Sequence, residues 1–151
     1  MPSKTEYRVG VVGVFTNPKN QLLVGQRSDI AKAWQFPQGG VEPGESQLAA
    51  LYREMEEEVG NANFEIIKVA SRLVKYSYPP DVKEGGAKYY CGQTQQWFLL
   101  KFNKELGPNL DKSDSEFVEF AWRTPVEIVK GIVDWKRASY LEGLRMLGVE
   151  I

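Results

Sequence analysis

The 151-residue chain contains no histidine and a single cysteine, Cys91. The lack of histidine excludes a Ser-His-Asp or Cys-His nucleophile system and any zinc site with histidine ligands. One cysteine can neither form an internal disulfide nor supply a zinc site built from thiolates. Any acid–base chemistry must therefore come from carboxylates, lysine, tyrosine or metal-bound water.

The chain also lacks a long apolar run and a surplus of charge of either sign. Its first residues have no apolar signal-peptide core, and no run approaches membrane-spanning length. The formal net charge of −1 argues against a protein that coats nucleic acid with a wholly basic surface, but it leaves room for a local basic pocket. Length and composition predict one domain, residues 1–151, in the cytoplasm and without a membrane partner.

The stretch from Gly39 to Gly60, GGVEPGESQLAALYREMEEEVG, predicts a tight glycine loop followed by one amphipathic helix. Ser46 can cap the start of this helix, and Gly60 suits the left-handed position just past its end. Apolar residues recur at helical spacing and predict one buried stripe. They are Leu48, Leu51, Tyr52, Met55 and Val59.

A second face of the same helix, about 120° away, carries Ala50 and the carboxylates of Glu54, Glu57 and Glu58. Like charges at these spacings destabilise a helix by a few tenths of a kcal/mol per pair, and they lie near the end that disfavours anions. A divalent cation such as Mg²⁺, Mn²⁺ or Ca²⁺ would offset both costs. The alternative is a solvated acidic face, which is the commoner outcome for an arbitrary acidic run.

The rest of the pattern predicts a mixed sheet flanked by helices. Strands are expected at 7–15, 21–27, 34–36, 64–78 with a bend near Ser71, 87–102 and 116–122. Thr124 and Pro125 predict the start of a short helix, and residues 134–147 predict a longer one. Its inner face is expected to carry Trp135, Ala138, Leu141 and Leu144.

The Gly39–Gly60 stretch resembles the Nudix box, Gly-x5-Glu-x7-Arg-Glu-U-x-Glu-Glu-x-Gly-U, where U is a bulky apolar residue. All seven fixed positions are filled, by Gly39, Glu45, Arg53, Glu54, Glu57, Glu58 and Gly60. Met55 fills the first U, whereas Asn61 departs from the last. Seven chance matches have a probability on the order of 10⁻⁶. The resemblance implies the Nudix fold, an α/β/α sandwich with a mixed central sheet.

The resemblance implies a metal-dependent hydrolase in which water attacks a phosphorus of a nucleoside diphosphate linked to another group. Glu54, Glu57 and Glu58 would bind Mg²⁺, or alternatively Mn²⁺, and one of them would act as the base. The carbonyl of Gln38 would join the metal shell. Arg53, paired with Glu45, would brace the loop against the helix, whereas an exposed pair would contribute little.

Segments outside the box resemble the bacterial RNA pyrophosphohydrolase group, which is close to the plant-type dinucleoside polyphosphate hydrolases. They are Tyr7-Arg8, WQFPQGG, KYSYP at 75–79, GQTQQWFLL at 92–100, SEF at 115–117 and WKRASY at 135–140. Val9-Gly10 departs from the group's usual Pro-Asn. The match makes Glu116 an additional metal carboxylate, and a plain loop charge is the alternative.

Several side chains outside the box can donate to phosphate oxygens. They are Arg8, Arg27, Lys136, Arg137 and Tyr140. Gly39, beside Gln38, would let the backbone approach the substrate closely. In the group, a ring at the Trp135 position stacks on a base and the neighbouring Lys136 contacts phosphate. A core position for Trp135 and a solvated helix face for Lys136 are the alternatives.

The resemblance favours removal of pyrophosphate from the 5′ end of triphosphorylated RNA. Hydrolysis of dinucleoside polyphosphates of the diadenosine tetraphosphate type, or of (deoxy)nucleoside triphosphates such as dGTP, are alternatives. A non-catalytic Nudix domain that senses nucleotides or RNA is an alternative of another class. The complete set of glutamates argues against it, because a pure binder has no need of them. The expected partners are an RNA 5′ end or a nucleoside polyphosphate, with weak support for a homodimer.

Overall fold

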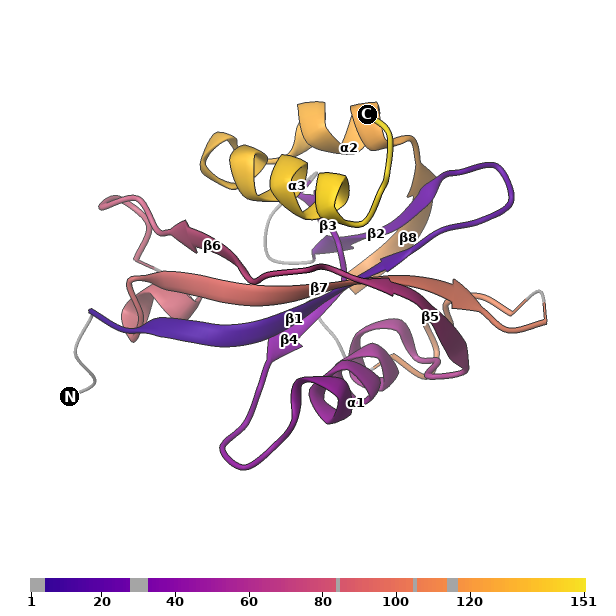
Figure 1. The fold of residues 1–151 in the computed structure, drawn as a ribbon, viewed down its shortest axis with the longest axis horizontal. Helices are drawn as coiled ribbons and strands as arrows, with labels where there is room; N and C mark the ends of the chain where they lie inside the picture. The colour runs from indigo at the N-terminus through magenta and orange to yellow at the C-terminus, as the bar shows by residue number, and fades with distance from the viewer. Residues whose placement is uncertain (1–4, 28–32, 84, 105, 114–116) are drawn as a thin grey trace.

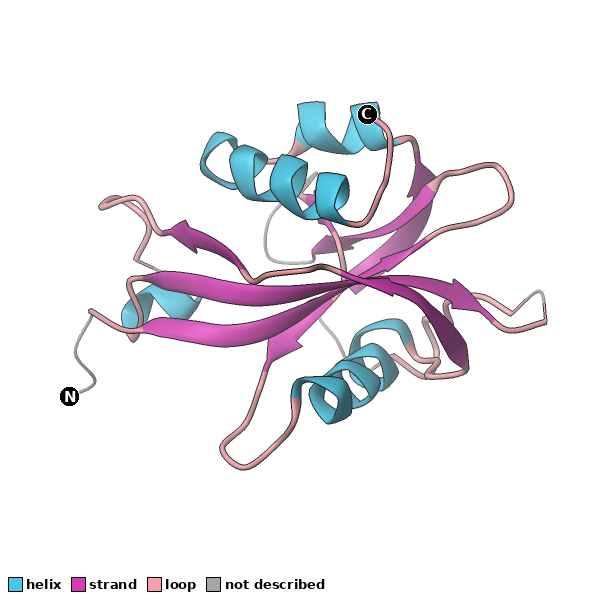
Figure 2. Cartoon of the chain, viewed as in Figure 1, coloured by secondary structure: helices cyan, strands magenta, loops and turns pink. Residues whose placement is uncertain are grey.

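The computed structural model describes residues 5–27, 33–83, 85–104, 106–113 and 117–151. The strands form a central twisted layer, with α1 on one side and α2 and α3 on the other (Figure 1). Parallel and antiparallel pairs both occur within this layer (Figure 2). The predicted α/β/α sandwich with a mixed sheet is therefore confirmed.

The first sheet has the strand order β4-β1-β7-β5, and β6 also pairs with β7. At its centre, β1 (Tyr7–Phe15) runs parallel to β7 (Gly92–Phe102) and antiparallel to β4 (Gln38–Gly40). β5 (Phe64–Val69) and β6 (Val74–Ser77) pair antiparallel with opposite ends of β7. The buried second half of β1 explains its continuous apolar run.

The second sheet is smaller, with β2 (Leu22–Arg27) between β3 (Trp34–Gln35) and β8 (Phe117–Arg123). Two hydrophobic clusters pack the layers together. One includes Trp97 and residues of α2 and α3, and the other includes Phe15 and residues of α1. The sheets therefore have helices packed on both faces, and the cavity described below lies at their edge.

The helix α1 (Gln47–Val59) begins and ends as the sequence predicts. The Ser46 hydroxyl accepts a hydrogen bond from the Ala49 N–H at 3.0 Å, and Gly60 adopts φ = 76°. A Cβ on Gly60 would lie 2.1 Å from the carbonyl oxygen of Asn109, so close packing also requires glycine there. These two ends fix the length of the helix that carries the acidic residues.

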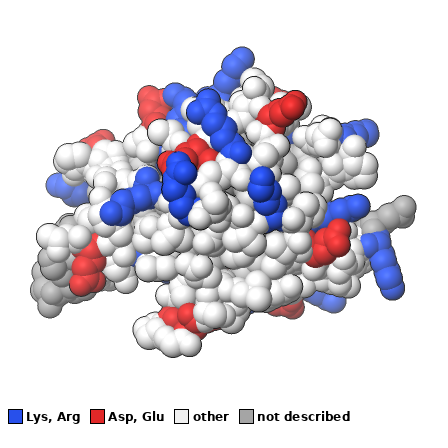
Figure 3. All heavy atoms as spheres, viewed as in Figure 1, with Lys and Arg blue, Asp and Glu red and all other residues white. Residues whose placement is uncertain are grey.

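The helices α2 (Pro125–Gly131) and α3 (Asp134–Met146) follow β8. Thr124 and Glu127 form a capping box, so the predicted Thr-Pro helix start is confirmed. No helix in the described part of the chain is both long and apolar enough to cross a lipid bilayer. On the face shown in Figure 3, basic and acidic side chains are interspersed, as the small net charge leads one to expect.

The buried face of α1 differs from the predicted apolar stripe. Leu51, Met55 and Val59 are buried as predicted, but Leu48 and Tyr52 are 50% and 40% exposed, and Ala50 and Glu54 are buried in addition. Glu54 can turn inward because Gly39 of β4 has no side chain and leaves room for its carboxylate. The spacing of apolar residues cannot predict that a carboxylate such as Glu54 is buried.

The inner face of α3 also differs from the prediction. Ala138 is exposed and Trp135 is half-buried. The buried residues are Lys136, Ser139, Tyr140, Gly143 and Leu144, of which only Leu144 was predicted. The reason is that Trp97 lies against Gly143, where a Cβ would come within 2.3 Å of the indole ring. A small residue therefore sets which side of this helix faces the sheet.

Three strand predictions were wrong. The stretch at 64–78 bends at Ser71 as predicted, but it is two strands, β5 and β6, instead of one, because the chain leaves the ladder between them. The strand expected from residue 87 begins at Gly92, since a 3-10 helix, η1 (Gly85–Lys88), comes first. The expected glycine loop at 39–40 is instead the strand β4, paired with β1.

Glu116, which was predicted to be an additional metal carboxylate, lies outside the described residues.

Candidate active site

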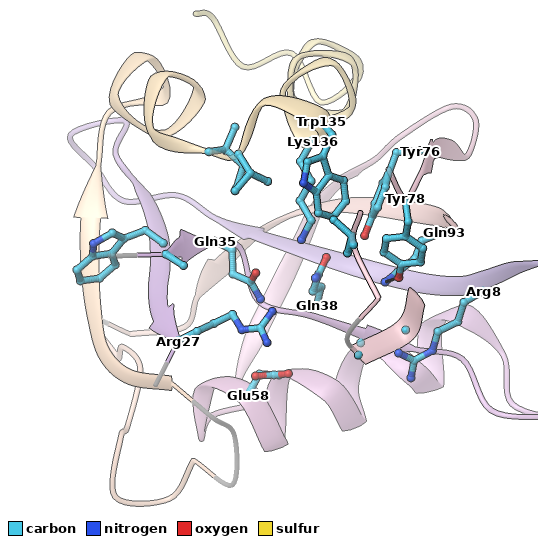
Figure 4. A pocket seen from close by; sticks show the side chains of 18 of the residues that line it. Arg8, Arg27, Gln35, Gln38, Glu58, Tyr76, Tyr78, Gln93, Trp135 and Lys136 are labelled. Atoms are coloured by element: carbon cyan, nitrogen blue, oxygen red, sulfur yellow. Dashed lines mark hydrogen bonds between the residues drawn. The ribbon is translucent and has the colours of Figure 1, made fainter. Parts of the chain in front are cut away.

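A cavity of about 920 Å³ lies between Glu54 and Glu58 of α1, the start of α3 and the first residues of η1, Gly85 and Gly86 (Figure 4). Six of the eight residues predicted to contact substrate line it. They are Arg8, Arg27, Gln38, Gly39, Trp135 and Lys136. Two of the predicted metal carboxylates, Glu54 and Glu58, line its other end. The structure thus brings residues from distant parts of the sequence to one opening.

Glu54 is the most buried carboxylate of the box, with 8% of its surface exposed. It lies against Gly39, where a Cβ would come within 1.9 Å of the carboxyl carbon. Burial raises the pKa of Glu54 above its usual value, although the Arg53 guanidinium acts in the opposite direction. The first glycine of the box is therefore required by the position of this carboxylate.

Arg53 connects the loop before α1 to the helix. Its guanidinium donates two hydrogen bonds of 2.8 Å to Glu45, one of 2.8 Å to the carbonyl of Gly40 and one of 2.7 Å to Glu54. Hydrogen bonds from Arg53 lower the pKa of Glu45 to about 2. The predicted Arg53–Glu45 pair is present and, because four of the five guanidinium N–H groups donate to the loop or to Glu54, it holds the loop in one position.

The three helix glutamates do not converge as closely as the sequence predicts. Glu57 is exposed and its carboxylate lies 3.6 Å from Arg53, whereas Glu58 lines the cavity. Within the ranges that the structure describes, no three His, Cys, Asp or Glu side chains are grouped tightly enough to hold a metal ion. The reason is that Arg53 attracts the carboxylates of both Glu54 and Glu57.

The oxygen-rich end of the cavity nevertheless suits a divalent cation of the hard type. Glu54 and Glu58 offer carboxylate oxygens, and the backbone of β4 at Gln38 and Gly39 lies beside them. The absence of a Cβ at Gly39 keeps this space open in front of a buried carboxylate whose charge is costly. The residues present therefore fit Mg²⁺ or Mn²⁺ better than a soft metal.

Lys136 occupies the opposite end of the cavity, with 8% of its surface exposed. Its ammonium nitrogen lies 5.3 Å from the ring centre of Trp135 and 5.8 Å from that of Tyr76. Burial, and then the charge of Arg27, lower its pKa to about 8. No carboxylate among the described residues forms an ion pair with it. A buried ammonium of this kind is matched to an anionic ligand.

Three aromatic rings form a wall beside Lys136. The ring centres of Tyr76, Tyr78 and Trp135 lie 5.6 to 5.8 Å from one another. The Tyr76 hydroxyl is buried and has no hydrogen-bond partner in the part of the chain that is described. Tyr78 was not among the predicted site residues, although its i,i+2 spacing from Tyr76 is the signal that would place both on one face of a strand. Trp135 lines the cavity rather than the core.

Tyr140 was expected to donate to substrate, and its position contradicts this. It is 3% exposed, and its ring packs 4.8 Å from that of Phe36 and 5.4 Å from that of Trp97. Its hydroxyl accepts a hydrogen bond from the Phe36 N–H at 3.2 Å. The sequence WKRASY places this tyrosine one helical turn beyond Lys136, on the side that faces the core.

Arg137 was also expected to reach phosphate, and it points elsewhere. Its guanidinium donates to the carbonyls of Val129 at 2.9 Å and Ile132 at 3.1 Å, and it pairs with Asp134 at 2.9 Å. These contacts satisfy carbonyls at the end of α2, where no further helical turn is present to accept them. Arg137 therefore ties α2 to α3.

A family model described as the NUDIX domain matches residues 6–143. This chain belongs to the Nudix family. The predicted family is thus confirmed over almost the whole domain, and Nudix hydrolases generally use divalent metal ions such as Mg²⁺. The one departure in the box, Asn61, makes polar contacts in place of an apolar anchor. Its side chain donates to the carbonyl of Gly107 at 3.0 Å and accepts from the Asn63 N–H at 2.8 Å.

Curated proteins of the same family resemble this Nudix domain along most of their length. Nudix hydrolase 25 of Arabidopsis thaliana is 36% identical over 152 residues, which cover 94% of this chain and 86% of that protein. The RNA pyrophosphohydrolase of Legionella pneumophila (strain Corby) is 38% identical over 146 residues, which cover 93% and 83%. Among solved structures, the Ap4A hydrolase binary complex of C. elegans is 19% identical, covers 93% of this chain and 97% of its own, and has a TM-score of 0.63. That likeness shows the shared fold.

Proposed function

We propose that this Nudix domain is a pyrophosphohydrolase that removes pyrophosphate from the 5′ end of triphosphorylated RNA and depends on Mg²⁺ or Mn²⁺. The observation that carries the proposal is one cavity with carboxylates at one end and, at the other, a buried ammonium beside aromatic rings that has no ion-pair partner among the described residues. The relatives named RNA pyrophosphohydrolase, at 33% to 38% identity, support the choice of substrate.

In this proposal the triphosphate lies along the cavity. Arg8, Arg27 and Lys136 neutralise and orient its oxygens, and the half-buried ring of Trp135 stacks on a base. Glu54, Glu57, Glu58 and the Gln38 carbonyl would hold the divalent ion. When bound, that ion neutralises phosphate charge and lowers the pKa of the attacking water.

The reaction consumes one water molecule. A bond forms between the water oxygen and a phosphorus, the phosphoanhydride bond to that phosphorus breaks, and a glutamate carboxylate accepts the proton. The products are a 5′-monophosphate RNA and pyrophosphate. Arg53 contributes by fixing the backbone at Gly40 and the carboxylate of Glu54, so that the reacting groups need no rearrangement.

The same cavity is also suited to dinucleoside polyphosphates. Beside the buried Tyr76, the half-buried rings of Tyr78 and Trp135 offer two stacking surfaces, and this favours a substrate with two bases as the second candidate. A nucleoside triphosphate such as dGTP requires only part of the cavity. A sensor without catalysis is disfavoured by the complete set of box glutamates.

The test is a comparison of pyrophosphate or phosphate release from triphosphorylated RNA, diadenosine tetraphosphate and dGTP. Each substrate is measured with Mg²⁺, with Mn²⁺ and with a chelator. The highest kcat/KM is expected for the RNA with Mg²⁺, and the chelator should abolish release. Replacing Glu57 and Glu58 together by Gln is expected to lower kcat by about a thousandfold, since both lose ligand charge.

Glu56→Gln is the matched control, because Glu56 is an exposed residue of the same helix and does not line the cavity. It should retain the rate of the unchanged protein. An undiminished rate in the double variant would overturn the catalytic assignment. Binding of RNA without any release, with either metal, would instead identify a sensor.

A further inference from the structure

A chain of side-chain hydrogen bonds runs through the wall of the cavity and has at its centre a residue that does not line the cavity. Gln95 of β7 is 2% exposed. Its amide nitrogen donates to the Gln38 side-chain oxygen at 2.9 Å and to the Gln93 side-chain oxygen at 3.1 Å. The Gln93 amide nitrogen in turn donates to the Tyr78 hydroxyl at 2.8 Å. This series of hydrogen bonds therefore links the strands β4 and β7 with Tyr78, which follows β6.

The direction of each bond follows from the number of donors and acceptors. An amide nitrogen carries two hydrogens, and Gln95 uses both of them. The oxygen of the Gln38 amide is then fixed toward Gln95, so its NH₂ group is left to donate elsewhere. Tyr78 accepts from Gln93, so its own O–H is also left to donate. Within the described residues, the Gln38 NH₂ group has no hydrogen-bond partner.

These donors face the space in which the phosphate chain would lie. Gln38, Tyr78 and Gln93 all line the cavity, and Gln38 directly precedes the glycine that packs on Glu54. Figure 4 shows Gln38 between Lys136 on one side and Glu58 on the other. Phosphate oxygens in a polyphosphate accept hydrogen bonds, so a wall of donors is complementary to them and a wall of acceptors is not.

We propose that Gln95 is a positioning residue that sets the polarity of this wall, so that Gln38 and Tyr78 both donate to phosphate oxygens of a bound polyphosphate. The inference rests on the proposed function and deepens it. It assigns a role to a buried residue that touches no substrate. This role accounts for a glutamine at the buried position 95, since an apolar side chain would fill the same space without orienting either neighbour.

Gln95→Glu is the sharpest test because it changes the polarity and almost none of the shape. A carboxylate only accepts, so the Gln38 amide must turn its NH₂ group toward residue 95 and present its oxygen to the phosphates. The KM for triphosphorylated RNA and the Kd for inorganic triphosphate should each rise about tenfold. The kcat should stay within about threefold, because the carboxylate end of the cavity is untouched.

Gln96→Glu is the matched control. It makes the same chemical change at the next residue of β7, but Gln96 donates to the carbonyl of Ala70 at 2.8 Å and does not line the cavity. Its KM should stay unchanged even if its thermal stability falls. Gln95→Met is the second variant, since it removes the orienting bonds without reversing them. Its KM should lie between those of the unchanged protein and Gln95→Glu.

Three results would overturn the inference. The first is an equal rise in KM for the changes at 95 and 96, and the second is a fall in kcat with KM unchanged; the third concerns the ligand group. A loss of affinity for RNA that leaves the Kd for inorganic triphosphate unaltered would assign the donors to a base instead of a phosphate. If the protein without substitutions binds inorganic triphosphate but releases no pyrophosphate from RNA, the proposed function is refuted, whereas the inference about Gln95 is not.

Discussion

The two ends of the cavity satisfy their polar groups in opposite ways. At the box end, Arg53 is surrounded by acceptors, with Glu45, Glu54 and the Gly40 carbonyl all within 2.8 Å. At the other end, Lys136 is buried with no carboxylate paired to it within the described residues, and the Tyr76 hydroxyl has no partner there. One end is internally complete, and the other is completed by a ligand.

The two ends of the cavity therefore contribute to different steps, one to the positioning of the reacting groups and the other to the binding of an anion. A saturated hydrogen-bond network holds carboxylates in place, and this is what a reaction that depends on positioning requires. Donors left without acceptors are costly in the free protein, so their cost is recovered only when an anion binds. Changes at the box end should therefore act on kcat, and changes at the Lys136 end should act on KM.

Gly39→Ala should produce the largest effect and separates the two ends most clearly. The new Cβ would lie 1.9 Å from the carboxyl carbon of Glu54, so Glu54 must leave its position. We expect kcat to fall by a hundredfold or more, and the free energy of unfolding to fall by about 1–3 kcal/mol because of overpacking. Steady-state kinetics and urea unfolding measure the two quantities.

Gly107→Ala is the control for this change, since a Cβ there would meet no atom within 4 Å. It should leave both kcat and stability close to those of the unchanged protein. If Gly39→Ala instead raised KM and left kcat intact, the assignment of kcat to the box end would fail.

Lys136→Met is expected to have a smaller effect, and on the other quantity. Removing the buried ammonium should raise KM at pH 7 by about tenfold, because a charge-assisted hydrogen bond to phosphate is lost. In the unchanged protein kcat/KM should decline above about pH 8, where Lys136 loses its proton, and in Lys136→Met this decline should be absent. Lys88→Met, at an exposed lysine, should change neither quantity.

The lowered pKa of Lys136 also fixes the sign of a stability change. Its pKa is about 8 in the folded protein and has the ordinary lysine value of 10.5 in the unfolded chain, so between these values the unfolded chain binds more protons. The free energy of unfolding of the unchanged protein should therefore rise from pH 8 to pH 10.5, relative to that of Lys136→Met, by about 3 kcal/mol at most. A difference that shrank over this range would contradict the burial of a charged amine.

The sequence predicted the box end more completely than the Lys136 end, and chain distance is the reason. Glu45 and Arg53 are eight residues apart within the stretch that resembles the Nudix box, and that resemblance led to the expectation of their contact. The bond between Gln38 and Gln95 joins residues 57 apart and depends on both strands flanking β1. No local periodicity carries that information.

The same reasoning explains which parts of the fold were missed. Caps and helix ends depend on neighbouring residues, and those at Ser46, Gly60 and Thr124 were predicted. Which face of a helix is buried depends on what lies opposite, and the spaces at Gly39 and Gly143 decided this for α1 and α3. A glycine on one element thus selects the buried residue on another.

Tyr140→Phe should have the smallest effect on activity, and it tests the boundary of the Lys136 end. Tyr140 follows Lys136 by one helical turn, but it packs in the core and accepts a hydrogen bond from the Phe36 N–H. Phenylalanine keeps the ring and leaves that buried N–H without an acceptor, which should lower the free energy of unfolding by about 1–2 kcal/mol. The midpoint of thermal unfolding should fall by a few degrees, while kcat and KM stay within about twofold. A rise in KM at unchanged stability would instead extend the ligand-completed end of the cavity to Tyr140, as the sequence alone led us to expect.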